Sequence, residues 1–318
     1  MTLDTPGFWP ALPYDEIAPT LEHLHRLAQI GAKYTLDQPF HPNWGNITLS
    51  ITPRGFATPT LWAGDTAFRV EYAILDDRVT VTASTGQISL PLAAGSVADF
   101  YKRFVEAVSQ LRIAAPRTVL ETEIADALHF DTDTETRPYD TAAARSVWAA
   151  FACASRALDE WQAPFRGPWP PVGIMWGGFD LYAPRYNGRQ IAPPGDAPAF
   201  QQNGMMAEVV AVGLSLGDRQ SRAASFFAYV SPPPEGIATA NFGVSGAAYD
   251  AKAGLVSLPW DTVRAAEDPR GTVVRFADAV YDVAVKLGGW PPDWTGTRHD
   301  GWYASSHSLW VAAEPRQL

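Results

Sequence analysis

The sequence is poor in cysteine and lysine. Its 318 residues include one cysteine, Cys153, which excludes an intrachain disulfide and a zinc site built on several cysteines. Only four residues are lysine, and the net charge is −10. Contacts to phosphate need a basic surface, so we expect no nucleic-acid partner. No basic amphipathic stretch is present either, which argues against binding to a membrane surface.

The chain also lacks targeting signals and catalytic signatures. No apolar run approaches the ~18 residues of a membrane-spanning helix. The first residues are acidic and rich in proline, unlike a secretory signal peptide, which predicts a cytoplasmic protein. The patterns GxSxG, GxxxxGK(S/T), GxGxxG and HExxH are absent. Nothing therefore indicates a nucleophile elbow, a phosphate loop or a dinucleotide site, and no cofactor is predicted.

The sequence contains two clear kinds of periodicity. Apolar residues at helical spacing predict amphipathic helices over about 15–34, 97–111, 141–162 and 271–287. Alternation of apolar and polar residues predicts antiparallel strands at 46–52, 58–62, 67–75, 78–83, 86–92, 171–183, 205–216, 224–231, 242–249 and 254–258. Ser96 and Asp268 are placed to cap the second and the last helix.

Two short matches indicate an internal repeat. GQISLPL (86–92) nearly coincides with GLVSLPW (254–260), and LSITPRG (49–55) resembles LYAPRYNG (181–188). We therefore predict an α+β fold of two pseudo-repeated halves, each an antiparallel sheet packed against long amphipathic helices. The halves would be residues 1–125 and 126–318, the second with a Trp-rich tail, and would pack as one unit.

The segment PVGIMWGGFDLYAPRYNGR (171–189) carries a lone carboxylate among aromatic side chains. Interpreted as one strand over 172–182, it places Trp176, Asp180 and Tyr182 on one face. A pocket there would raise the pKa of Asp180 and suit it to acid–base work, with the two aromatic residues contacting the ligand. The alternative is a solvent-facing strand on which Asp180 pairs with Arg185, itself a candidate ligand contact.

A second acid and one helix face complete the candidate site. Glu208 shares its strand face with apolar residues, so it is either functional or paired with an arginine. His25, Gln29 and Lys33 recur every four residues and form a polar stripe, which is either a solvated flank or a set of one base and two ligand contacts. We add two aromatic residues as candidate ligand contacts, Trp44 and Tyr229.

Several motifs in this order resemble a bacterial family of uncharacterised proteins, catalogued as a domain of unknown function. They are WPALPYDE (9–16), LHRLAQIGAK (24–33), ITPRGF (51–56), SVADFYKRF (96–104), WGGFDL with RYNGR (176–189), FFAYVSPPPEG (226–236) and LPWDTVRAAEDP (258–269). The resemblance implies histidines where this chain has Asn43, Gly173 and Ala207, so this chain is a divergent member. Histidines together with Asp180 and Glu208 would suit a metal site, most of whose imidazoles this chain lacks.

Three hypotheses follow. The first is a small-molecule-binding protein or cofactor-independent enzyme with an aromatic, mostly apolar pocket, in which Asp180, Glu208 and His25 are catalytic and no metal is bound. The second is a metal-dependent enzyme whose ligands include the two acids and a histidine. The third is a non-catalytic protein that forms homo-oligomers through its Trp-rich tail.

Overall fold

The structure is a computed structural model that describes residues 9–192, 195–196 and 199–295, so most of the Trp-rich tail lies outside the described residues. Its helices are α1 (Tyr14–Ala32), α2 (Val97–Gln110), α3 (Thr141–Gln162), α4 (Ala199–Gly204), α5 (Trp260–Arg264) and α6 (Pro269–Gly288). Its strands are β1 (Thr48–Thr52), β2 (Gly55–Ala57), β3 (Leu61–Ala63), β4 (Thr66–Ala73), β5 (Arg78–Ala83), β6 (Gly86–Pro91), β7 (Gly173–Met175), β8 (Asp180–Gln190), β9 (Ala207–Ser215), β10 (Ser225–Ser231), β11 (Ala248–Asp250) and β12 (Leu255–Pro259).

The long helices begin and end close to the predicted positions. Ser96 Oγ accepts a hydrogen bond from Asp99 N at 3.1 Å, and Asp268 Oδ1 accepts one from Gly271 N at 3.0 Å. Each cap satisfies a backbone donor that has no partner within its helix. Both predicted caps are confirmed. Among the described helices, none is long and apolar enough to cross a membrane.

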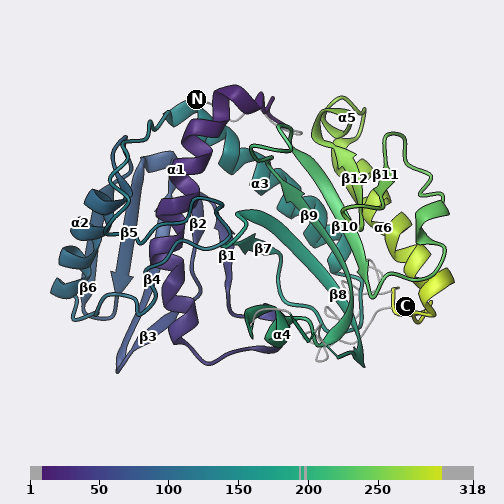
Figure 1. Cartoon of the computed structure of the whole chain (residues 1–318), viewed down its shortest axis with the longest axis horizontal. Coiled ribbons are helices and arrows are strands. Elements are labelled where there is room, and N and C mark those ends of the chain that lie inside the picture. The colour runs from purple at the N-terminus through teal and green to yellow at the C-terminus, as the bar shows by residue number, and fades with distance from the viewer. Residues whose placement is uncertain (1–8, 193–194, 197–198, 296–318) are drawn as a thin grey trace, which may run out of the picture.

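The described strands form one antiparallel sheet. Its order is β11-β12-β10-β9-β8-β7-β1-β2-β4-β5-β6, with β3 beside β4. In Figure 1 the sheet runs along the long axis, with β5 and β6 near one end and β11 and β12 near the other. The two predicted groups of strands meet where β1 pairs with β7, and there Leu49 lies opposite Ile174. The α+β class is confirmed, and a single sheet continues through both parts of the chain.

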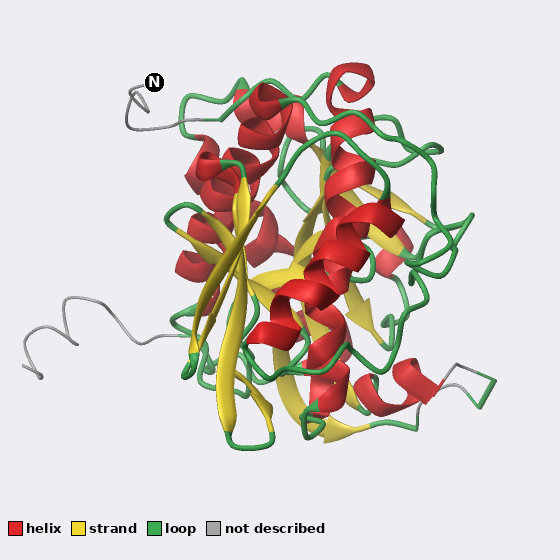
Figure 2. Cartoon of the chain, turned by 90° about the vertical axis from the view of Figure 1, so that its left-hand side faces the viewer, coloured by secondary structure: helices red, strands yellow, loops and turns green. Residues whose placement is uncertain are grey.

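The four long helices pack on one face of this sheet. The register places Phe56 opposite Tyr72, and both side chains are fully buried. The Tyr72 hydroxyl donates toward the carbonyls of Leu27 and Ala28 at 2.9 Å and accepts from Gly31 N at 2.9 Å. α1 contacts α2 and α3, and α3 contacts α6, so the helices form one layer; Figure 2 gives the view from the α2 end.

The opposite face of the sheet differs between its two parts. On β4 and β5 it carries polar side chains such as Arg69 and Thr80, which are exposed or half-buried. On β8 and β9 it carries a second apolar cluster that includes Tyr182, Tyr186 and Val209, against which Tyr229 packs. β8 and β9 are therefore buried on both faces along most of their length, whereas the outward face of β10 is half-buried.

The segment predicted as one strand over 172–182 is instead a hairpin. β7 ends at Met175, the chain turns through residues 176–179, and Asp180 begins β8 opposite Met175. Phe179 has φ 55°, and its ring packs between core aromatic rings. Because the chain reverses at Gly177 and Gly178, Trp176 enters the core, whereas Asp180 starts the next strand.

Gly31→Ala should destabilise the protein, although helix propensity alone favours alanine by about 1 kcal/mol. A Cβ at position 31 would lie 2.7 Å from Tyr72 Oη and from Val70 Cγ1. α1 would have to move away from the sheet, and we expect a loss of about 1–3 kcal/mol in urea unfolding. Gly288→Ala is the control, since its Cβ would meet the nearest atom of Trp290 at 3.4 Å. Equal stability of the two variants would refute this packing.

Candidate functional site

A cleft of about 400 Å³ opens where the β7–β8 turn and the β9–β10 loop meet α1. Its walls come from α1, from residues 123–126 of the acidic segment between α2 and α3, from Gly178 and Phe179, and from residues 215–220. The rings of His25 and Phe179 stack with their centroids 5.3 Å apart. The cleft is therefore built from four segments that are distant in the sequence.

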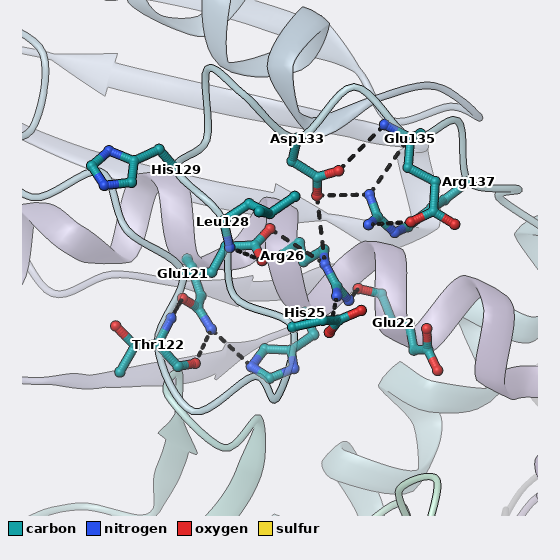
Figure 3. Close-up of polar contacts among 12 residues, drawn as sticks. Glu22, His25, Arg26, Glu121, Thr122, Leu128, His129, Asp133, Glu135 and Arg137 are labelled. Carbon is teal, nitrogen blue, oxygen red and sulfur yellow. Dashed lines mark hydrogen bonds and ion pairs between the residues drawn. The ribbon is translucent and has the colours of Figure 1, made fainter.

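Arg26 forms ion pairs that hold the acidic segment between α2 and α3 against α1 (Figure 3). Its side chain is 3% exposed, and its Nε lies 3.3 Å from Glu121 Oε1 and 3.6 Å from Asp133 Oδ2, both on fully buried side chains. Arg26 Nη2 also donates to Asp126 Oδ1 at 2.9 Å. Arg137 Nη1 holds Asp133 from the other side at 2.8 Å. Charges buried this deeply are stable only when paired, which gives the segment one position on the helix.

The carboxyl of Glu121 tends to hold a proton in this cluster. Desolvation raises its pKa, and the neighbouring Asp133 raises it further, against the opposing effects of the Leu128 N–H and Arg26. Leu128 N donates to Glu121 Oε2 at 3.2 Å. Glu121 therefore takes up a proton at a higher pH than an ordinary glutamate does.

Gln29 and Lys33 form hydrogen bonds with Thr122, the residue that follows Glu121 in the acidic segment. Gln29 Oε1 accepts from Thr122 N, and Gln29 Nε2 donates to Thr122 O, both at 2.8 Å. Lys33 Nζ donates to Thr122 Oγ1. Glu123 then takes a left-handed conformation with φ 58°, which is uncommon for a residue with a side chain. The clamp on Thr122 thus determines where the Glu123 carboxylate lies.

Two carboxyl groups meet over the glycine turn. A Cβ on Gly177 would lie 2.5 Å from Glu123 Oε1, and a Cβ on Gly178 would lie 2.5 Å from Asp180 Oδ1 and 3.3 Å from Glu123 Oε2. Only glycine leaves room for both groups here.

The pKa values of both carboxyls are raised. Burial, and then the charge of Glu123, raise the pKa of Asp180 to about 7. Burial also raises the pKa of Glu123, which Lys33 opposes, although Glu123 keeps one side open to solvent. Two adjoining carboxyls that cannot both ionise easily hold a proton between them near neutral pH.

The pKa values of His25 and Lys33 both lie below their usual values. His25 Nε2 lies 2.7 Å from the Gly177 carbonyl oxygen, to which only a protonated Nε2 can donate. Desolvation lowers the pKa of His25 to about 4, so the ring is neutral at pH 7. Lys33 is 2% exposed and its Nζ lies 4.7 Å from the Trp176 ring centroid. Burial lowers the pKa of Lys33 to about 8.

The structure brings half of the predicted site residues together around the glycine turn: His25, Gln29, Lys33, Trp176 and Asp180. Trp176 is a core residue, whose Nε1 donates to Thr35 Oγ1 at 3.2 Å. Tyr182 and Tyr229 belong to the apolar cluster on the other face of the sheet, and the charge of Asp180 contributes to the raised pKa of Tyr229. Tyr182 and Tyr229 therefore lie on the face of Asp180 without lining the cleft.

Glu208 and Trp44 are placed elsewhere. Arg189 Nε lies 3.3 Å from Glu208 Oε2, to which the Asn187 amide also donates. This is the arginine pair that was the alternative for Glu208. Trp44 stacks on Phe200 with centroids 5.4 Å apart and donates to the Phe200 carbonyl at 3.0 Å. Neither residue is among those that line the cleft.

Arg185 is a core residue instead of a ligand contact. It is fully buried, and its guanidinium lies 3.8 Å from the Trp161 ring centroid and 4.8 Å from that of Tyr281. It donates to the carbonyl of Trp161. Positions 180 and 185 have opposite parity on β8 and so face opposite sides of the sheet. The expected pairing of Asp180 with Arg185 is therefore wrong.

Sequence reasoning did not single out Glu123. It lies in the acidic, Thr-rich segment 121–140, whose composition is typical of a linker or a surface strand. The only signal available was the density of carboxylates around it, which a solvated linker would show equally well.

Two of the positions at which the family resemblance implies histidines, Gly173 and Ala207, do not converge. Gly173 lies level with Gly213 of β9, whereas Ala207 is six residues away along that strand, about 20 Å at the rise of a strand. A Cβ on Gly173 would also lie 2.7 Å from Thr48 Cβ. Among the described residues, no group of three or more His, Cys, Asp or Glu is placed to hold a metal ion.

Comparison with known proteins places the chain in a family. Residues 9–296 match the model of a family of unknown function, DUF5996, and the chain belongs to that family. The resemblance seen in the sequence is thereby confirmed. No curated protein and no solved structure matches the chain.

Arg26→Met should cost about 3–5 kcal/mol in urea unfolding, because it leaves Glu121 buried without its cation and removes one of the two cations beside Asp133. Arg69→Met is the control, since its pair with Glu71 is solvent-exposed and should contribute at most about 1 kcal/mol. Adding Glu121→Gln to Arg26→Met should restore part of the loss. A single Arg26 variant as stable as the Arg69 variant would contradict the role assigned to the cluster.

Asp180→Asn should change how stability depends on pH. The folded pKa of Asp180, about 7, lies above the unfolded value of about 3.9, so its contribution is full below pH 4 and lost as pH rises through 7. The stability of the wild type minus that of Asp180→Asn should fall over this range by at most about 1.4 kcal/mol per pH unit. The opposite contribution of His25 cancels in this difference. Asp131→Asn, at an exposed aspartate of the acidic segment, should show no such slope, and a rising difference for Asp180 would disprove the assignment.

Proposed function

We propose that this family member is a cofactor-independent acid–base enzyme that binds a small molecule in the cleft at α1. The Glu123–Asp180 pair would transfer a proton to or from the bound molecule. The observation that carries the proposal is the meeting of these two carboxyls over Gly177 and Gly178, beside a cleft of about 400 Å³.

The protonation of the pair suits this role. A general acid or base works best when its pKa lies near the working pH, and the pKa of Asp180 is about 7. Asp180, which does not line the cleft, then holds the proton, and Glu123, which does line it, exchanges the proton with the bound molecule. His25 forms part of the floor as a neutral ring oriented by the Gly177 carbonyl.

The cleft has the size of a small-molecule site. Ligand pockets span about 300–1,000 Å³ and carry a few fixed polar groups. The lining here combines carboxylates and arginines with Phe179, Leu21 and Leu216, so it is more polar than the aromatic pocket expected from the sequence.

We also infer that the two parts of the chain are a repeat. The order helix, strands, helix occurs twice, as α1, β1 to β6, α2 and as α3, β7 to β12, α6. Reading outward from the β1–β7 pair, the strands follow chain order in both directions except at β3, which lies beside β4, and at β11, which lies beyond β12. GQISLPL and GLVSLPW fall on β6 and around β12, which are equivalent positions. LSITPRG spans β1 and β2, whereas LYAPRYNG lies on β8 alone, so only the first match supports the repeat.

The cleft can be tested with a blocking variant. Ala125 is exposed and lines the cleft, so Ala125→Trp should abolish binding of small molecules found by ligand-observed NMR screening of a diverse library. Ala142→Trp, at an exposed position of α3, is the control and should bind like the wild type. Hits that bind both variants equally would refute the cleft as the site.

Proton transfer is tested on those hits that the wild type converts. Asp180→Asn and Glu123→Gln should lower kcat about 10²- to 10⁴-fold while the hits still bind. Glu267→Gln, at an exposed glutamate, should keep wild-type turnover. Wild-type turnover by Asp180→Asn would rule out the proposed role of the pair.

A further inference from the structure

The charged side chains that line the cleft differ in whether they have an oppositely charged partner. Arg26 is paired with Asp126 at 2.9 Å. Arg219 lies 3.1 Å from Glu22 Oε2 and 3.5 Å from Asp126 Oδ2. Both arginines of the lining therefore have carboxylate partners within the protein, and neither is left as an uncompensated anion-binding group.

Glu123 has no comparable partner. Within the described part of the chain, its carboxylate forms no ion pair within 4.0 Å and no hydrogen bond. The ammonium that acts on its pKa, that of Lys33, is buried and donates to Thr122 Oγ1 instead. The remaining acid, Asp218, is used within its own turn, where Oδ1 accepts from Gln220 N and Ser221 N at 2.6 Å.

Glu123 is also held in place. The residue before it is clamped by both ends of the Gln29 amide, and the residue before that is bound to Arg26. A fixed group loses less conformational freedom when it binds a ligand. The cleft thus presents one unpaired carboxylate, carried by a residue whose backbone is fixed.

The floor beside this carboxylate is uncharged. His25, which is neutral near pH 7, stacks on Phe179, and Leu21 and Leu216 lie in the same lining. Such a surface accepts a hydrocarbon or aromatic group and does not repel a cation. An anionic ligand would instead face Glu123, Glu22, Asp126 and Asp218.

We infer that the ligand of this cleft is a small organic cation, an amine or guanidine attached to an apolar group, whose charged end contacts Glu123. This inference rests on the proposed function, because it takes the same cleft as the ligand site. A charge-assisted hydrogen bond to an otherwise unpaired carboxylate would supply affinity, and the apolar group would cover the His25–Phe179 stack.

Binding of a cation should release a proton. The positive charge favours the ionised form of both Glu123 and Asp180, so the proton that they hold near neutral pH leaves. Affinity should therefore rise with pH up to about 7. The other titratable or charged groups around the pair are Tyr14, Glu22, His25, Arg26 and Lys33 on α1, Asp126, Asp218 and Arg219 on the two loops, and Tyr229 on β10.

The test uses probes that share a carbon skeleton and differ in charge. Each set contains an amine, an alcohol and a carboxylate, such as 3-phenylpropylamine, 3-phenylpropan-1-ol and 3-phenylpropanoate, with benzyl, cyclohexylmethyl and hexyl sets beside it. Calorimetry at pH 6.5 in buffers of different ionisation enthalpy gives both the affinity and the number of protons released. We expect an amine to bind about 10- to 100-fold more tightly than its alcohol, with proton release.

Variants separate this inference from the proposed function. Glu123→Gln should remove the preference for the amine and leave the alcohol unchanged, whereas Glu267→Gln should alter neither. Carboxylates that bind as tightly as amines, with binding lost in Ala125→Trp, would overturn the cationic ligand and leave the cleft as the site. Amine binding without proton release, or unaffected by Glu123→Gln, would also overturn it. If no probe of any charge binds, or if binding survives in Ala125→Trp, the inference and the proposed site both fail.

Discussion

The buried ion cluster of Arg26 is the constraint on which the candidate site depends. The acidic segment between α2 and α3 has little regular structure of its own, so side-chain contacts must give it a position. Arg26 and Arg137 fix it through Glu121 and Asp133, whose side chains are fully buried. Removing these charges from water is costly, and only the matched pairing offsets the cost. The same pairing places the next residues against α1.

The glycine turn allows the carboxyls of Glu123 and Asp180 to lie close together. Gly177 and Gly178 admit two carboxyls at distances that a Cβ would not allow. Desolvation is the largest effect on the pKa of Asp180, and repulsion from Glu123 adds to it. Lys33 acts against the shift of Glu123 but is buried beneath Thr122, so it moderates the pair without neutralising it by contact. The result is an acid that can hold a proton next to an acid that faces the cleft.

A core residue and the candidate acid lie on opposite faces of the sheet. Arg185 and Asp180 lie on the same strand, yet Arg185 is stacked among core aromatic rings, whereas Asp180 lies beside the glycine turn on the other face. Opposite parity on the strand accounts for this difference. Tyr182 and Tyr229 share the face of Asp180 and cover it from the strand side, which lowers the polarity around the acid and supports its raised pKa.

Local sequence patterns determined most of the helices and strands of this protein. Helical spacing located α3 at 141–162 and placed His25, Gln29 and Lys33 on one face of α1, because residues four apart on a helix are neighbours whatever surrounds them. Alternation found most strands and set the sides of β8. It could not show that Gly177 and Gly178 reverse the chain, nor that Glu123 and not Glu208 would join Asp180. Those outcomes depend on which segments distant in the sequence lie in contact. Here the contacts depended on the pairing of buried charges and on the two glycines, which have no Cβ atom.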